Sequence, residues 1–132
     1  MGSLLRFKNE YLGTVYEDII RSSSYEYALH GVIPFMPMET GKWWGNVKDE
    51  SGWHESEVDV IAYDNANILI GECKFRNKAV GIGELNDLRA KAAFIPTRGR
   101  NVYYLLASRS DFTDDVRSSD AILIDKAGLL KS

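Results

Sequence analysis

The sequence predicts an α/β domain whose mixed β-sheet carries helices on both faces. Three observations support this prediction. An amphipathic helical segment comes first, two apolar segments around a polar turn follow, and a strand–helix–strand unit comes after them. A unit of the last kind is typical of parallel strand pairing. The 132 residues suit one globular domain, and we treat 1–132 as a single unit.

The first predicted element is a helix from about Asn9 to Leu29. Its apolar residues recur at three- and four-residue spacing and form one stripe: Leu12, Val15, Tyr16, Ile19 and Ile20. Glu17 lies beside this stripe, so we expect its carboxylate to reach the edge of whatever the helix covers. The serine run 22–24 is expected to kink the helix, and Gly31 to end it.

The next segment contains few strand signals. Residues 32–38 hold two prolines, which predict an edge strand or a loop. Two tryptophans then stand between Gly41 and Gly45. They form either a hydrophobic anchor in a short strand or a stacking surface for a base or a partner. Residues 46–55 are polar and are predicted to be a loop that carries His54 on the surface.

The centre of the predicted sheet is a hairpin over residues 57–74. Both of its arms are apolar, and the residues 64–67 between them are of types that tolerate a tight reversal. A symmetric turn pairs Tyr63 with Ile68, so the numbers of paired residues sum to 131. Asp59 then lies opposite Glu72.

Charged side chains in this apolar hairpin require an explanation. The two-residue period of a strand puts Glu72 and Lys74 on one face, with Asp59 across the ladder. Such groups are almost never fully buried unless they are paired. A divalent metal between Asp59 and Glu72, with Lys74 beside it, satisfies them, and so does a structural salt bridge. The spacing leaves both interpretations open.

The C-terminal half is predicted to alternate helices and strands. Residues 82–94 have helical spacing, and the continuous apolar segment 102–107 is typical of a strand that is covered on both faces. A short helix over 111–119, a strand over 121–125 and a final helical turn over 126–131 complete the order.

Charge is unevenly distributed along the chain. The net charge is −3, yet residues 74–100 hold seven basic and two acidic side chains. This basic segment is either a phosphate-facing surface or a solvated helix face. Its candidate nucleic-acid contacts are Arg76, Lys78, Arg89 and Lys91. The single cysteine favours a cytoplasmic protein without disulfides, and there is no apolar run of membrane-spanning length and no secretory signal pattern.

These residues resemble a known family. Asp59, followed after twelve residues by Glu72-Cys73-Lys74, is similar to the D…(D/E)xK motif of the PD-(D/E)xK nuclease superfamily. The segments Gly41–Trp44, Glu57–Ala62 and Gly71–Lys74 resemble the nuclease-like C-terminal domain of certain archaeal and bacterial ATPases. Glu17 matches the helical acid of archaeal Holliday-junction-resolvase-like proteins. The resemblance implies the restriction-endonuclease-like three-layer core, α-β-β-β-α-β.

The resemblance also implies chemistry, namely hydrolysis of DNA phosphodiester bonds with Mg²⁺ or Mn²⁺. Asp59, Glu72 and Glu17 are the expected metal ligands, together with the carbonyl group of Cys73. Carboxylate and carbonyl oxygens suit a hard cation. Lys74 is the expected catalytic lysine, which orients the attacking water or stabilises the charge of the transition state.

Two features of the sequence favour other interpretations. The chain is acidic, and it has no module that reads a nucleic-acid sequence, whereas phosphate neutralisation dominates affinity for nucleic acids. A fused or associated ATPase, or a homodimer, would have to supply the grip on DNA. The same features fit a catalytically silent regulatory or docking domain of an ATPase.

Overall fold

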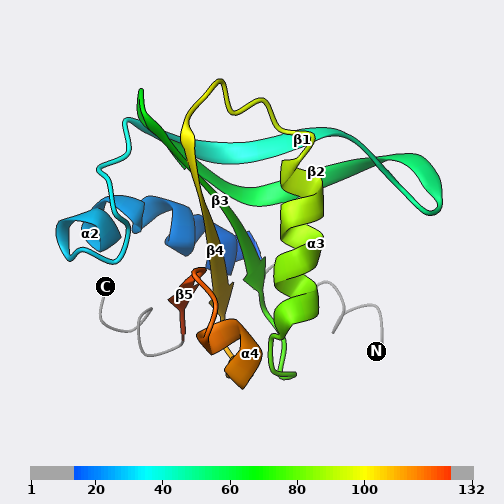
Figure 1. Ribbon diagram of the computed structural model, residues 1–132. Coiled ribbons are helices and arrows are strands. Elements are labelled where there is room, and N and C mark those ends of the chain that lie inside the picture. The colour runs from blue at the N-terminus through cyan, green and yellow to red at the C-terminus, as the bar shows by residue number, and fades with distance from the viewer. Residues whose placement is uncertain (1–13, 126–132) are drawn as a thin grey trace.

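The structure, a computed structural model, describes residues 14–125 (Figure 1). Five strands form one mixed sheet in the order β1-β2-β3-β4-β5. Their bounds are Glu39–Asp49 for β1, Gly52–Tyr63 for β2, Asn67–Lys74 for β3, Asn101–Ser108 for β4 and Ile122–Ile124 for β5. Strands β1, β2 and β3 pair antiparallel, while β3, β4 and β5 pair parallel. The predicted α/β fold with a mixed sheet is confirmed.

The helices lie where the sequence predicted them, with shorter bounds. Residues 14–22 are helical, a turn at Ser23 follows, and α2 then spans Ser24–Leu29. Helices α3 and α4 span Ile82–Ala92 and Asp114–Arg117. Gly31 has φ 77°, a conformation that favours glycine, and it follows the end of α2 as predicted.

Two parts of the predicted helices, residues 9–13 and the final turn over 126–131, lie outside the described residues. Within the described ones, no helix is both long and apolar enough to cross a bilayer.

The core consists of two apolar layers, one on each face of the sheet. Successive residues of β3 alternate between them, because side chains in a strand point to opposite faces. Ile68 and Ile70 pack against the α3 layer, whereas Leu69 packs against the layer formed by residues 14–22 and α2. Figure 1 shows α3 on one side of the sheet and the N-terminal helices on the other.

The register between β2 and β3 is the predicted one. Tyr63 pairs with Ile68, and the ladder continues to Val60 opposite Gly71. The Asp64 carboxylate holds the turn, since Oδ1 accepts the backbone N–H groups of Ala66 and Asn67 at 2.9 and 2.7 Å. The paired residues of this ladder end at Val60 and Gly71, one step before Asp59 would face Glu72.

A β-bulge in β2 lies at that point. Gly41 of β1 pairs with Ile61, but Trp43 pairs with Val58, so two residues of β2 oppose the single Lys42. The bulge reverses the alternation: Val58 packs in the α3 layer, and Val60, only two residues later, packs in the opposite layer. Bulges re-aim side chains, and here the residue that is re-aimed is Asp59.

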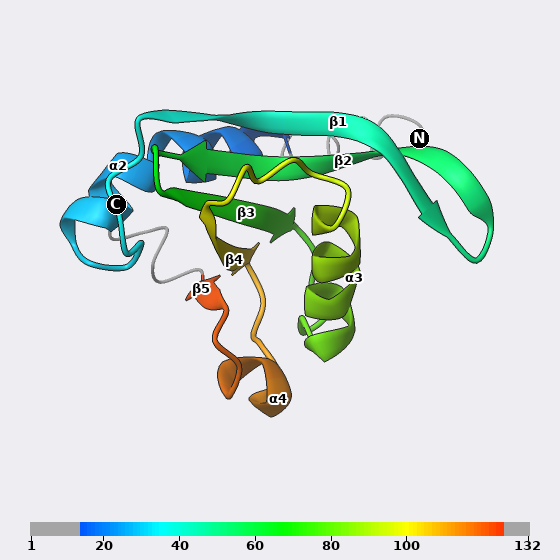
Figure 2. The ribbon, with the colours of Figure 1, turned by 45° about the horizontal axis from the view of Figure 1, so that its top comes forward.

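The prediction of a loop over residues 46–55 is wrong. This segment is the outer half of a β1–β2 hairpin, which stands out from the rest of the fold in Figure 2. The turn is tight because Gly52 adopts φ 99° and the Asp49 carboxylate accepts the Ser51 N–H at 2.9 Å. Most side chains of the projecting strands are exposed and Val47 is the buried one among them, so their sequence lacks the apolar alternation that identifies strands.

The two tryptophans have different environments. Trp43 packs against the α3 layer, as the anchor interpretation predicted. Its ring lies over Gly45, where an added Cβ would approach the Trp43 ring to 2.2 Å. Trp44 is exposed, with the Lys42 ammonium 5.6 Å from its ring centroid.

Candidate functional site

Asp59 is buried at the bulge and is held from two sides. Its Oδ2 accepts the backbone N–H of Cys73 at 2.9 Å, which replaces the next rung of the β2–β3 ladder. Arg21, from the helical residues 14–22, donates from Nη1 to the Asp59 carbonyl oxygen at 2.7 Å. The backbone and the side chain of Asp59 are therefore both fixed.

Glu17 reaches Asp59 from the helix that covers one face of the sheet. Burial, and then the negative charge of Asp59, raise the pKa of Glu17 above its ordinary value. The Lys42 ammonium, 3.5 Å from Glu17 Oε2, opposes this rise. The expectation that Glu17 reaches the edge of the covered surface is confirmed.

Glu72 reaches Asp59 from β3. Its side chain is 8% exposed, and Lys91 of α3 donates to its Oε1 at 2.7 Å. The Lys91 ammonium also donates to the carbonyl oxygen of Glu57 at 3.2 Å. Burial, and then the charge of Asp59, raise the pKa of Glu72 to about 7. We call Glu17, Asp59 and Glu72 the carboxylate cluster.

The lysine that pairs with this cluster from α3 is Lys91, whereas the sequence analysis predicted Lys74 beside the carboxylates. Within residues 14–125, the Lys74 ammonium has no hydrogen bond or ion pair, and Lys91 is the partner of Glu72. Lys91 was predicted as a phosphate contact only. A usable signal is its place in α3 between the buried Leu88 and Ala92, which puts it at the margin of the buried face. Nothing in the sequence pattern singles out Lys42 or Arg21.

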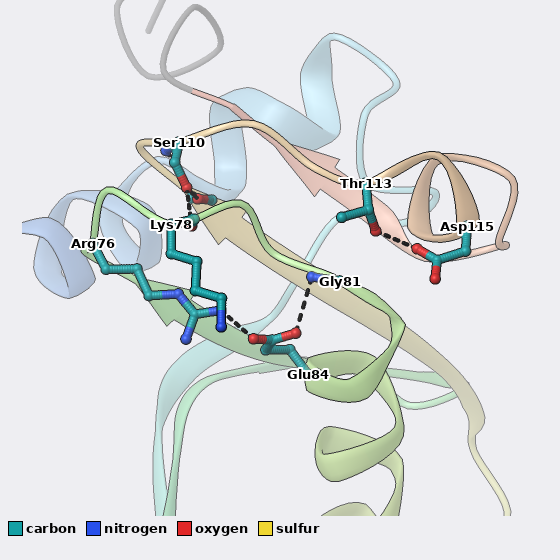
Figure 3. A network of polar contacts seen from close by, with 8 residues as sticks. Arg76, Lys78, Gly81, Glu84, Ser110, Thr113 and Asp115 are labelled. Atoms are coloured by element: carbon teal, nitrogen blue, oxygen red, sulfur yellow. Dashed lines mark hydrogen bonds and ion pairs between the residues drawn. The ribbon is translucent and has the colours of Figure 1, made fainter.

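Two of the other candidate nucleic-acid contacts also have carboxylate partners. Arg76 pairs with Glu84, whose second oxygen accepts the Gly81 N–H at 2.9 Å at the start of α3 (Figure 3). Arg89 pairs with Asp120 at 3.1 Å. Lys78 is exposed, and among the described residues its one hydrogen bond is accepted by its carbonyl oxygen from Ser110 Oγ at 2.6 Å (Figure 3). The basic segment is thus partly neutralised.

Residues 3–89 match the model of DUF234, a family described as archaeal and bacterial proteins of unknown function. The match covers more than half of the chain. The chain belongs to the DUF234 family. The matched segment includes the whole carboxylate cluster and Lys74, whereas Lys91 lies just beyond it.

One solved structure shares the fold of this DUF234 chain. It is the crystal structure of AF1548, a protein of unknown function, with a TM-score of 0.56 and 18% sequence identity. The similarity covers 88% of this chain and 65% of the other, so this chain spans about two thirds of that protein's length. Likeness at this identity concerns the fold alone. No curated protein matches the chain.

The donor set of this DUF234 chain suits a hard divalent cation, because carboxylate oxygens are what Mg²⁺ and Mn²⁺ prefer. Burial raises the pKa of the Cys73 thiol well above its ordinary value, so the sulfur stays protonated and is a poor ligand. Among the described residues, no three Asp, Glu, His or Cys side chains form a ready metal-binding group. In the structure, Glu17 and Glu72 are each paired with a lysine.

Proposed function

We propose that this DUF234 chain is a divalent-cation-dependent hydrolase of DNA phosphodiester bonds, with the carboxylate cluster as its metal site. The observation that carries the proposal is the meeting of three carboxylates, from a helix and two strands, where the β2–β3 ladder ends. Placing carboxylates together in a buried position costs free energy, and the attraction of a bound cation offsets this cost. The arrangement also agrees with the resemblance to PD-(D/E)xK nucleases.

On this proposal Asp59, Glu72 and Glu17 hold Mg²⁺ or Mn²⁺, which supplies Lewis-acid stabilisation of phosphate charge and a more acidic bound water. Asp59 is the fixed ligand, because the Cys73 N–H and Arg21 hold it in place. With the cation bound, Glu17 and Glu72 would exchange their lysine partners for it. Lys91 would then be released beside the cluster, with Lys74 two residues along β3 from Glu72, and either ammonium would stabilise negative charge on the phosphate.

A second candidate function is a catalytically silent regulatory or docking domain of an ATPase. The observation that favours it is that Lys42 and Lys91 already neutralise two of the three carboxylates. In either case the net charge of −3 and the partly neutralised basic segment predict a low affinity of the chain alone for DNA. An attached or associated ATPase, or a second copy of the chain, would supply the additional affinity for DNA.

Cleavage tests the first candidate directly. Linear duplex, flap, four-way junction and single-stranded DNA are incubated with wild type, Asp59→Asn and Asp64→Asn, with Mg²⁺ or Mn²⁺. Asp64 is the matched control, because its carboxylate holds the hairpin turn outside the cluster. We expect nicked products from wild type and Asp64→Asn, and none from Asp59→Asn. Equal cleavage by Asp59→Asn, or no cleavage by wild type, would contradict the hydrolase proposal.

A further inference from the structure

A pocket of about 460 Å³ lies on the α3 side of the sheet, and none of its lining residues belongs to the carboxylate cluster. Its walls come from β1, β2, β3 and the loop between α3 and β4. Isoleucines and a proline supply apolar surface, Trp43 and Tyr63 supply aromatic rings, and the charged lining residues are all basic: Lys42, Arg98 and Arg100. A cavity of this size, mostly apolar with a few polar groups, is typical of small-ligand sites.

Arg98 occupies a backbone position that does not suit arginine. It has φ 53° and the next residue, Gly99, has φ 76°, in a turn closed by the Arg100 N–H to the Thr97 carbonyl oxygen at 3.1 Å. Turns with two such residues favour Asn, Asp or Gly. A strained residue that persists is a reason to look for a function. Within residues 14–125, the Arg98 guanidinium has no hydrogen bond or ion pair, so it is free to bind an anion.

Arg100 and the two aromatic rings are already fixed in place. The Arg100 guanidinium lies 5.2 Å from the ring centroid of Tyr63 and donates from Nε to the Asp64 carbonyl oxygen at 2.7 Å. The Tyr63 hydroxyl donates to Glu39 at 2.6 Å. Trp43 is seated over Gly45. Fixed aromatic and cationic groups reduce the entropy that a ligand loses on binding.

We propose that this pocket binds one unpaired nucleotide of a DNA strand, an inference that rests on the proposed function for its choice of ligand class. The base packs against Trp43 and Tyr63, because aromatic rings stack on any base. The adjoining phosphate is bound by Arg98 and Arg100, since guanidinium groups match phosphate oxygens.

The position of the pocket relative to the carboxylate cluster supports this choice. Lys42 lines the pocket and also pairs with Glu17 of the cluster. Along β3, Ile68 of the pocket is four residues from Glu72, which corresponds to about 13 Å. A DNA strand bound in the pocket would have to cover this separation to reach the cluster. The substrate class that follows is DNA with an unpaired end, flap or branch, rather than intact duplex.

The test measures binding by fluorescence anisotropy in a metal-free buffer with chelator, so that cleavage does not enter. The probes are a labelled single-stranded oligonucleotide, the blunt duplex of the same sequence and an abasic strand of the same length. We expect wild type to bind the single strand more tightly than either of the other probes. Equal binding of all three probes, or no binding of the single strand, overturns the inference.

Arg98→Asn is the decisive variant, and Arg117→Asn is its control. Arg117 lies on α4, outside the pocket, and the two changes remove the same charge. We expect Arg98→Asn to bind the single strand roughly tenfold more weakly, the loss of one charged hydrogen bond. Its Tm should equal or exceed that of wild type, because asparagine suits a positive φ. Arg117→Asn should bind like wild type. Unchanged affinity in Arg98→Asn overturns the inference.

The outcome separates this inference from the proposed function. If Arg98→Asn weakens binding while wild type cleaves no DNA with any cation, the nucleotide pocket stands and the hydrolase proposal fails. If wild type cleaves DNA and Arg98→Asn binds the single strand normally, the pocket proposal alone fails.

Discussion

Replacing Lys91 with methionine is expected to lower the free energy of unfolding by about 2 kcal/mol at pH 8. Removing one partner of a buried ion pair costs about 3–5 kcal/mol, because the remaining charge stays buried. Glu72 is buried here, but the Lys91 side chain is 30% exposed, and solvent screening reduces the expected loss. The loss should be smaller at pH 5, where Glu72, with a pKa of about 7, is protonated. Denaturant unfolding at the two pH values measures both quantities.

A double-mutant cycle separates the ion pair from the packing of the Lys91 side chain. Lys91→Met combined with Glu72→Gln should recover most of the loss at pH 8, because no buried charge is left unpaired. Lys78→Met serves as the control, since Lys78 is an exposed lysine, and its expected effect is within about 0.5 kcal/mol. Equal losses for Lys91→Met at pH 5 and pH 8 would show that Glu72 is not its partner.

The second large effect is a change in the pH dependence of stability. The pKa of Glu72 is about 7 in the folded chain against an ordinary value of 4.5, so the folded state holds a proton that the unfolded state releases. This contribution to stability is complete below about pH 4.5 and is lost as the pH rises through about 7. At about 1.4 kcal/mol per pKa unit, the change amounts to about 3 kcal/mol at most.

Glu72→Gln should remove this pH dependence and make the chain more stable than wild type at pH 8. The raised pKa of Glu17 acts in the same direction, so part of the decline with pH should remain in the variant. Unfolding free energies of wild type and Glu72→Gln, measured at half-unit steps from pH 4.5 to 8, give the difference curve. A difference that stays flat across this range would mean that Glu72 titrates normally.

The predicted part of the candidate site follows from local rules. The turn at Asp64 fixes the β2–β3 register, and that register brings Asp59 and Glu72 to the same end of the ladder. The helical period places Glu17 at the margin of the buried face, where it meets Asp59. Each of these inferences needs only neighbours in sequence, which is why the sequence sufficed.

The unpredicted part depends on tertiary geometry. The bulge inserts one residue opposite Lys42, and a run of apolar residues looks the same with or without that insertion. The pairing of Lys91 with Glu72 depends on the orientation of α3 across the sheet. The two-residue period of β3 placed Lys74 beside the carboxylates instead. This period describes the side chains of one strand and carries no information about the helix that packs over it.

The paired lysines give the carboxylate cluster two alternative sets of counter-ions. Without a divalent cation, Lys42 and Lys91 neutralise Glu17 and Glu72. On our proposal, a bound cation would replace both lysines as the counter-ion of the cluster, and Lys91 would then be available to the phosphate. Cation binding should therefore weaken as the pH falls below about 7, because protons then compete for Glu72.

Calorimetric titration of Mn²⁺ at pH 8 is the most direct test of the claim that the carboxylate cluster is a metal site. Wild type, Asp59→Asn and the turn control Asp64→Asn are titrated in one buffer. We predict one binding site per chain in wild type and in Asp64→Asn, and no binding in Asp59→Asn. An absence of binding in wild type, or undiminished binding in Asp59→Asn, would contradict the claim and leave the cluster as a salt-bridge network that only joins the first helix and α3 to the sheet.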